Sequence, residues 1–235
     1  MLRIIHLKND LRQILRDPIM AVLMVAPLFL IIAFKFMLLY LMPFILSITE
    51  FDVSPYLDYV YIFVVMKCGA MLGIVTGFMM MDDRDGKIAE LMSVTPLGRA
   101  GYLLNRLFFT ATLSVFYSIL SYYVLNVVEL PFITMLFVSL LASNYAIIIG
   151  LLIFTCADDK VKGLTFAKAI NSLSLFAFTD LLALKWLTVL SWLFPPYWIT
   201  LVVQSPHAFF IYGLALLVNF GWLFILIKYY SKKES

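Results

Sequence analysis

The sequence predicts an all-α membrane protein with six transmembrane helices, an N-terminal amphipathic surface helix, a short cytoplasmic helix and a re-entrant outer hairpin between spans five and six. Of its 235 residues, 64% are hydrophobic and only 13% are charged, whereas a soluble domain carries about 25% charged residues. The mean hydropathy is +1.01. Both cysteines lie inside apolar runs, which excludes a disulfide framework.

The spans follow from the length of the apolar runs. A hydrocarbon core of about 30 Å requires about 20 apolar residues in a helix. Segments such as IIIGLLIF are apolar on every side, which excludes the alternating pattern of a β-barrel strand. Six runs qualify within one transmembrane domain over 1–235: 18–46, 58–81, 107–125, 132–157, 168–184 and 206–227.

The distribution of basic residues predicts the orientation. Lys and Arg concentrate on the cytoplasmic side of membrane proteins. Fourteen of the 17 basic residues fall in 1–17, 82–106, 160–168 and 228–233, whereas the links 47–57 and 126–131 contain none. We therefore expect a multi-pass protein of a bacterial-type cytoplasmic membrane, with both termini in the cytoplasm.

Residues 185–204 offer two interpretations, a seventh span or an outer hairpin. Pro195 and Pro196 interrupt the run and break a helix. A seventh crossing would also place the C-terminal lysines outside. The hairpin is therefore favoured, with an aromatic belt formed by Trp186, Trp192, Tyr197 and Trp198.

Residues 1–17 interleave apolar and basic side chains at helical spacing. This pattern is typical of an amphipathic helix on the inner membrane surface, and a basic tail without structure is the alternative. The apolar run that follows is too long for the core of a signal peptide.

The cytoplasmic link 82–99 reads DDRDGKIAELMSVTPLGR. Asp85 can cap a short helix that places Ile88, Leu91 and Met92 on one face, and Thr95-Pro96 ends it. A short helix outside the bilayer with one apolar face is suited to transfer force from a soluble partner. An ordinary solvated loop is the alternative.

Two segments carry a resemblance to a known family. LKNDLRQILRDP before a long first span, and MMDDRDGKIAELMSVTPLGRAGYLLNRL after the second, resemble permeases of the type-2 ABC exporter superfamily. The short basic loop DDKVKGLTFAK and the outer segment FPPYW agree with it. The resemblance covers essentially the whole chain, although aspartate stands where the family often has glutamate before the glycine at 86.

The resemblance implies a half-transporter that binds two cytoplasmic ABC ATPase subunits and a second permease copy or a paralogue, surrounded by membrane lipid and without nucleic acid. Residues 82–98 would form the coupling helix, residues 3–17 the connecting helix, and spans one, two and five the dimer interface and substrate path. The residues expected to contact or support the ATPase are Asp83, Asp85, Gly86, Ile88, Glu90, Leu91, Thr95 and Pro96.

The residues indicate that this chain is not an enzyme. A P-loop requires G-x-x-x-x-G-K-[ST], and none of the ten glycines falls in that pattern. We expect ATP and Mg²⁺ to bind the partner ATPase, and no cofactor to bind this chain. The only two histidines, His6 and His207, fall on opposite sides of the predicted membrane, which excludes a shared metal site.

Three ionisable residues fall well inside the predicted spans: Lys35, Lys67 and Asp180. Such groups are costly in the bilayer and are functional candidates. In one interpretation Asp180 forms an ion pair with Lys67 or Lys35. In another the lysines line a wet cavity and meet an anionic cargo group, and in a third a lysine snorkels to the outer interface.

Span two also carries Gly69, Gly73 and Gly77 at intervals of four. Small residues in such a ridge allow helix backbones to approach closely. The ridge predicts tight packing, either within the chain or across a dimer.

Together these features favour the permease subunit of an ATP-driven exporter. A membrane anchor that docks a cytoplasmic partner without transport is the alternative. The outer links are short, and this is compatible with a drug, a lipid, an amphipathic peptide, haem or a glycan precursor as cargo.

Overall fold

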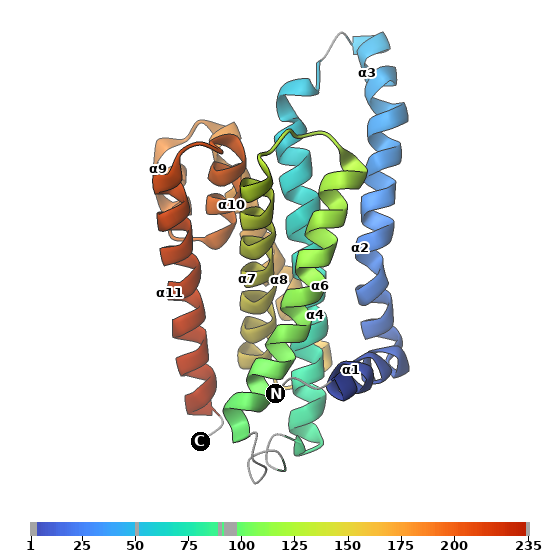
Figure 1. Ribbon diagram of the computed structural model, residues 1–235, viewed down its shortest axis with the longest axis vertical. Coiled ribbons are helices and arrows are strands. Elements are labelled where there is room, and N and C mark those ends of the chain that lie inside the picture. The colour runs from blue at the N-terminus through green and yellow to red at the C-terminus, as the bar shows by residue number, and fades with distance from the viewer. Residues whose placement is uncertain (1–3, 50–51, 89–90, 92–97, 234–235) are drawn as a thin grey trace.

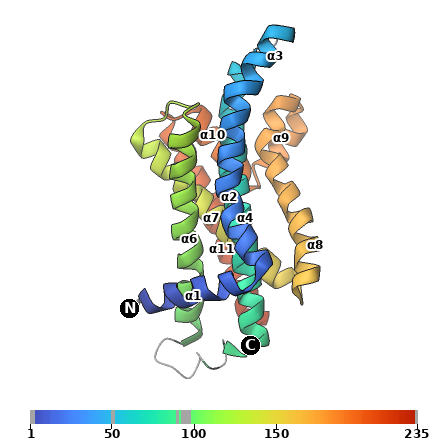
Figure 2. The same cartoon turned by 90° about the vertical axis from the view of Figure 1, so that its right-hand side faces the viewer.

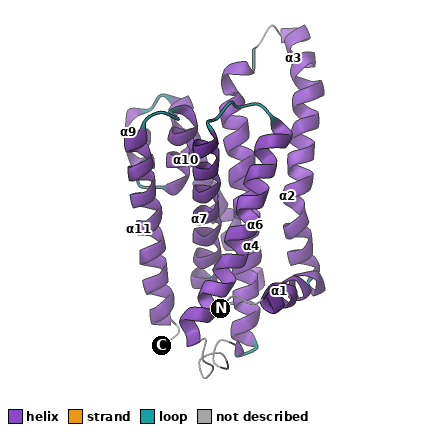
Figure 3. Ribbon diagram, in the orientation of Figure 1, coloured by secondary structure: helices purple, strands orange, loops and turns teal. Residues whose placement is uncertain are grey.

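The computed structural model describes residues 4–49, 52–88, 91 and 98–233, and every regular element in these ranges is a helix (Figures 1 and 3). The long helices run side by side, and α1 (Ile4–Arg16) lies across them at one end. Both ends of the described chain also lie there, and we call this the α1 end (Figure 1). The predicted all-α membrane protein is confirmed.

Five described helical segments are long and apolar enough to cross a membrane. The first runs through α2, the π-helix η1 and α3, and the second is α4 with a short 3-10 helix, η2, before it. Their bounds are α2 Pro18–Phe36, η1 Met37–Leu41, α3 Met42–Thr49, η2 Ser54–Tyr56, α4 Leu57–Asp85, α6 Gly98–Leu125, α7 Phe132–Cys156 and α11 Phe209–Lys233. The sequence predicted that the third span begins at residue 107, but helix α6 already begins at Gly98.

The predicted fifth span consists of α8 (Lys160–Asn171) and the 3-10 helix η3 (Ser172–Leu182), which rise from the α1 end (Figure 2). It is not among the five segments above. It begins at Lys160 rather than at residue 168, because the Asp159 carboxylate accepts a hydrogen bond from the Lys162 amide (2.8 Å) and caps the helix.

Residues 185–204 form a hairpin of α9 (Lys185–Ser191) and α10 (Pro195–Gln204), bent by 106°. Both helices lie in the half of the bundle away from the α1 end (Figure 1). The prolines occupy the first turn of α10, where a missing N–H leaves no helix bond unmade. Thr200 Oγ1 donates to the Ala177 carbonyl (2.8 Å) and fixes α10 against η3.

Helix α4 lies at the centre and packs against α2, α6 and α7. Most of its length is buried, whereas α2 is covered on one side only. The glycine ridge faces α7 within the same chain. A Cβ atom on Gly73 would lie 2.5 Å from the Ala146 carbonyl oxygen, and one on Gly77 would lie 3.1 Å from the Gly150 carbonyl oxygen. The ridge therefore allows the α4 and α7 backbones to touch.

Candidate functional site

Among the described residues, the most highly connected polar group lies at the α1 end, where α1, α4 and α6 meet. We call it the junction cluster, and its members are Asp10 and Gln13 of α1, Asp83 of α4, and Tyr102 and Arg106 of α6. The Arg106 guanidinium donates to both carboxylate oxygens of Asp83 (2.7 and 2.9 Å), to Asp10 and to Gln13 (3.1 Å). The Tyr102 hydroxyl donates to Asp83 (2.5 Å).

The junction cluster is buried, so its hydrogen bonds are shielded from water. The Asp83 side chain is 0% exposed and that of Arg106 is 9% exposed. A charged pair in such surroundings holds its geometry firmly, because losing one partner leaves an uncompensated buried charge. The cluster therefore joins the surface helix to both spans that flank the 82–99 link.

A second ionic contact joins α8 to the same end. Lys160 Nζ binds the carboxylates of Asp17, which precedes α2, and Asp82 of α4 (2.8 Å). Asp17 also caps α2, where it accepts from the amides of Ile19 and Met20. Partial burial raises the pKa of Asp17, but the hydrogen bonds from Lys160 and these amides outweigh it and hold the pKa below the ordinary value. Partial burial lowers the pKa of Lys160, but Asp17 and Asp82 outweigh it and raise the pKa above the ordinary value.

The predicted ATPase-contact residues separate into two groups. Asp83 is buried in the junction cluster and is not available to a soluble partner. Asp85 and Gly86 are exposed, Ile88 is half-buried and Leu91 is 66% exposed. Glu90, Thr95 and Pro96 lie outside the described residues.

The turn after α4 differs from the predicted one. Asp85 is the last residue of α4 rather than the cap of a new helix, because α4 continues unbroken out of the apolar region. Lys87 then adopts a positive φ of 53°, which redirects the chain. The Leu91 amide donates to the Lys87 carbonyl (3.1 Å), which gives one helical turn beyond α4.

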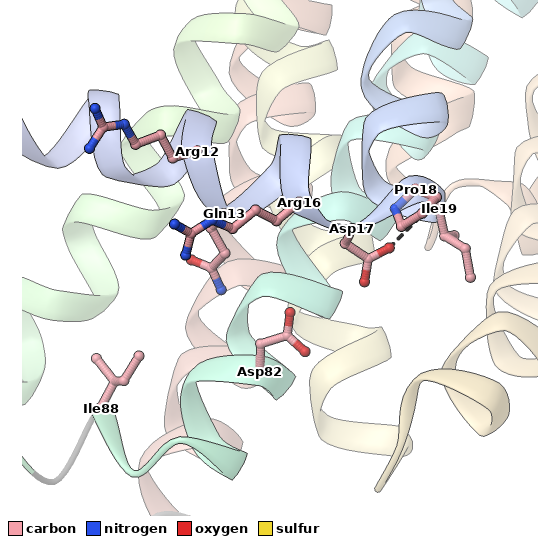
Figure 4. A pocket seen from close by; sticks show the side chains of 8 residues that line it. All are labelled: Arg12, Gln13, Arg16, Asp17, Pro18, Ile19, Asp82 and Ile88. Atoms are coloured by element: carbon pink, nitrogen blue, oxygen red, sulfur yellow. Dashed lines mark hydrogen bonds between the residues drawn. The ribbon is translucent and has the colours of Figure 1, made fainter.

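An open groove of about 880 Å³ separates α1 from this turn (Figure 4). Asp82 lies across it from Gln13 and Arg16, and Ile88 stands at its far edge. Arg12 and Arg16 are exposed and have no carboxylate partner among the described residues. Its lining consists of Arg12, Gln13, Arg16, Asp17, Pro18, Ile19, Asp82 and Ile88.

The ionisable groups inside the spans do not meet one another. Lys35 donates to the carbonyl of Leu125, the last residue of α6 (3.0 Å). Lys67 donates to Asn171 of α8 (2.9 Å) and Ser174 of η3 (3.0 Å).

Asp180 accepts instead from hydroxyl groups at the hairpin, those of Tyr197 (3.3 Å) and Thr188 (3.5 Å). In the described part of the chain no ion pair joins Asp180 to either lysine. The predicted ion pair of Asp180 with Lys67 or Lys35 is therefore not formed among the described residues.

The sequence pattern did not predict that Asp10, Gln13, Tyr102 and Arg106 belong to a site. Arg106 was counted only as one of the basic residues that set the orientation. A signal was present, because Tyr102 and Arg106 are four residues apart and share a helix face once α6 begins at Gly98. The late predicted start of α6 concealed it.

Comparison with known proteins gives a family and two relatives. Residues 10–227 match the family described as "Fluoroquinolones export permease protein Rv2686c-like". The fluoroquinolones export permease proteins MT2760 and Rv2686c, from the CDC 1551 / Oshkosh and ATCC 25618 / H37Rv strains of Mycobacterium tuberculosis, are each 23% identical to this chain over 198 residues. The alignment covers 81% of this chain and 77% of each relative. No solved structure matches the chain.

Proposed function

The chain belongs to the Rv2686c-like family of fluoroquinolone export permeases, and from this premise we propose that it is the membrane-spanning subunit of an ATP-driven exporter. The family match over residues 10–227 carries the proposal. It favours a permease over a membrane anchor without transport, because the match covers the spans, the junction cluster and the 82–99 link together.

The proposed assembly contains a second permease subunit, either a copy of this chain or a paralogue, and two ABC ATPase subunits that bind ATP and Mg²⁺. We place the α1 end in the cytoplasm, because basic residues gather there and cytoplasmic segments are rich in Lys and Arg.

The groove beneath α1 and the turn beyond α4 form the proposed docking surface for the ATPase. Ile88 lies on both, and Leu91 offers an exposed apolar side chain close by. The junction cluster supports the transmission of movement, since Arg106 and Asp83 hold together the spans on either side of the link. A displaced link would therefore move α1, α4 and α6 as one unit.

The proposed cargo is a small amphipathic drug of the fluoroquinolone class, after the names of the relatives. Alternating access would carry it: ATP closes the motor pair, the link moves, and the two permease subunits open a path toward the outer side.

The test is ATP-dependent uptake of norfloxacin into inverted membrane vesicles that contain the chain and an ABC ATPase that co-purifies with it. We expect uptake that stops when the catalytic glutamate of the ATPase is replaced by glutamine. If the ATPase co-purifies and hydrolyses ATP but no norfloxacin enters, the fluoroquinolone assignment is wrong. If no ATPase co-purifies, the anchor alternative is favoured.

A further inference from the structure

Between residues 61 and 81, helix α4 is buried except along one narrow stripe. Three of its side chains, Tyr59, Phe63 and Lys67, recur at intervals of four and are only partly buried. The neighbours Ile62, Val64, Val65 and Met66 are each at most 1% exposed. An interval of four places the three side chains on one helix face, and α4 packs against both α2 and α8.

Aromatic rings from three helices meet along this stripe. The Phe63 ring lies 5.5 Å from that of Phe34 on α2 and 6.2 Å from that of Phe178 on η3, measured between centroids. Tyr59 lies 6.0 Å from Phe178. The rings are tilted by 39–51° rather than stacked. They therefore offer flat apolar surfaces rather than one closed stack.

Lys67 places a cation at the inner end of this aromatic group. Its Nζ atom lies 5.2 Å from the centroid of the Phe63 ring. Its two hydrogen-bond partners, Asn171 and Ser174, are neutral, and it takes part in no ion pair among the residues that the structure describes. A lysine has three donors, and a charge held in a membrane span without a counter-charge is costly.

The other lysine in the spans is not equivalent. Lys35 donates to the last carbonyl of α6, where the helix dipole concentrates negative charge and stabilises a cation. Lys35 thus fastens α2 to α6. Lys67, with neutral partners only, is the lysine whose charge an incoming anion would balance.

We infer that Lys67, Phe63 and Phe178 form a specificity site for planar aromatic carboxylates. The carboxylate pairs with the Lys67 ammonium group, and the aromatic ring packs against Phe63 and Phe178. This inference rests on the proposed function and deepens it, because it names the chemical feature by which the exporter selects its cargo. A second copy of the chain fits the stripe less well, since two such rows facing each other about a two-fold axis would oppose their lysines.

Equilibrium binding to the purified full-length chain tests the inference, with norfloxacin and its carboxamide as probes. We expect norfloxacin to bind at least tenfold more tightly than the carboxamide. Lys67→Gln should remove this preference by weakening norfloxacin binding alone, and Lys67→Arg should retain most of it. Lys35→Gln is the matched control, because it also removes a lysine from a span but should leave the preference unchanged.

Three results would overturn the inference. The first is equal binding of the two probes by the wild-type chain. The second is an equal loss of both with Lys67→Gln, which would make Lys67 only a link between α4 and α8. The third is a spontaneous disulfide between two Phe63→Cys chains in a Cys156→Ser background, because a second copy would then occupy the stripe. Selective binding without ATP-dependent uptake would instead contradict the proposed function.

Discussion

The guanidinium of Arg106 binds both carboxylate oxygens of Asp83, with Nε 2.7 Å from Oδ2 and Nη2 2.9 Å from Oδ1. Two parallel hydrogen bonds of this kind fix the angle between the groups as well as their distance. Asp83 stands near the end of α4 and Arg106 near the start of α6. The pair therefore closes the base of the link that connects these helices.

Replacing Arg106 with glutamine should destabilise the protein strongly. Asp83 would remain buried without its charged partner, and the loss of one member of a buried pair costs about 3–5 kcal/mol. Unfolding in detergent, followed by circular dichroism, measures the change. Lys162→Gln is the control, because it removes a lysine from an exposed pair with Asp158 and should cost less than about 1 kcal/mol. Equal effects of the two variants would contradict the role of the buried pair.

Gly73→Ala should separate α4 from α7. The added Cβ would lie 2.5 Å from the backbone oxygen of Ala146, and overpacking of this kind costs about 1–3 kcal/mol. Gly213→Ala in α11 is the matched control, because a Cβ there meets nothing within 4 Å. Thermal unfolding of the two variants in the same detergent gives the comparison. A Gly73→Ala protein as stable as Gly213→Ala would show that the helices adjust without cost.

Leu91→Glu should weaken ATPase binding and leave the fold intact. The Leu91 side chain is 66% exposed, so a charge there costs little in the free chain but is buried without a partner in a complex. We expect at least tenfold less ATPase to co-purify. Val161→Glu provides the control, since Val161 of α8 is also apolar and 79% exposed but does not line the groove. If both variants retain the ATPase, the docking surface lies elsewhere.

The contact between Asp17 and Lys160 should make stability depend on pH at both extremes. The pKa of Asp17 is lowered in the folded state, so its contribution is present above about pH 4 and is lost as pH falls through the folded value. The pKa of Lys160 is raised, so its contribution is present below about pH 10 and is lost as pH rises through the folded value.

Because the Asp17 and Lys160 side chains are partly exposed, each effect should be at most about 1 kcal/mol. Asp17→Asn isolates the charge, since asparagine caps a helix about as well as aspartate does. Unfolding measured between about pH 3 and 7 should show the Asp17 contribution in the wild type but not in this variant. If the variant loses stability at low pH as the wild type does, the pH dependence comes from other carboxylates.

Hydropathy was sufficient to predict most of the fold. The bilayer demands long apolar helices, so four of the six predicted spans match helices with only small errors at their ends. The two exceptions are the span predicted at 168–184 and the span formed by α6. The hairpin was also predictable, because Pro195 and Pro196 fit the first turn of a new helix but not the interior of a continuous one. The start of α6 was placed too late, since the apolar run that defined the span begins only after Arg106.

The site was less predictable, because its members are distant in sequence. Asp83 and Asp85 belong to one acidic run in the sequence. In the structure Asp83 is buried against Arg106, whereas Asp85 is exposed. Lys35 and Lys67 likewise look equivalent in sequence. Their roles differ because Lys35 donates to the Leu125 carbonyl, whereas Lys67 donates to the Asn171 side chain. Such pairings depend on how the helices pack and leave no local pattern.

The contact of Gly73 with Ala146 has a consequence for biogenesis. Ribosomes add about 5–20 residues per second, so α7 emerges several seconds after the bare face of α4 has been made. During this interval lipid tails must cover a surface shaped for a protein backbone, and neighbouring nascent helices could dock there wrongly. We expect an insertase or a membrane chaperone to shield α4 during synthesis, with the shielding ending when Ala146 and Gly150 arrive.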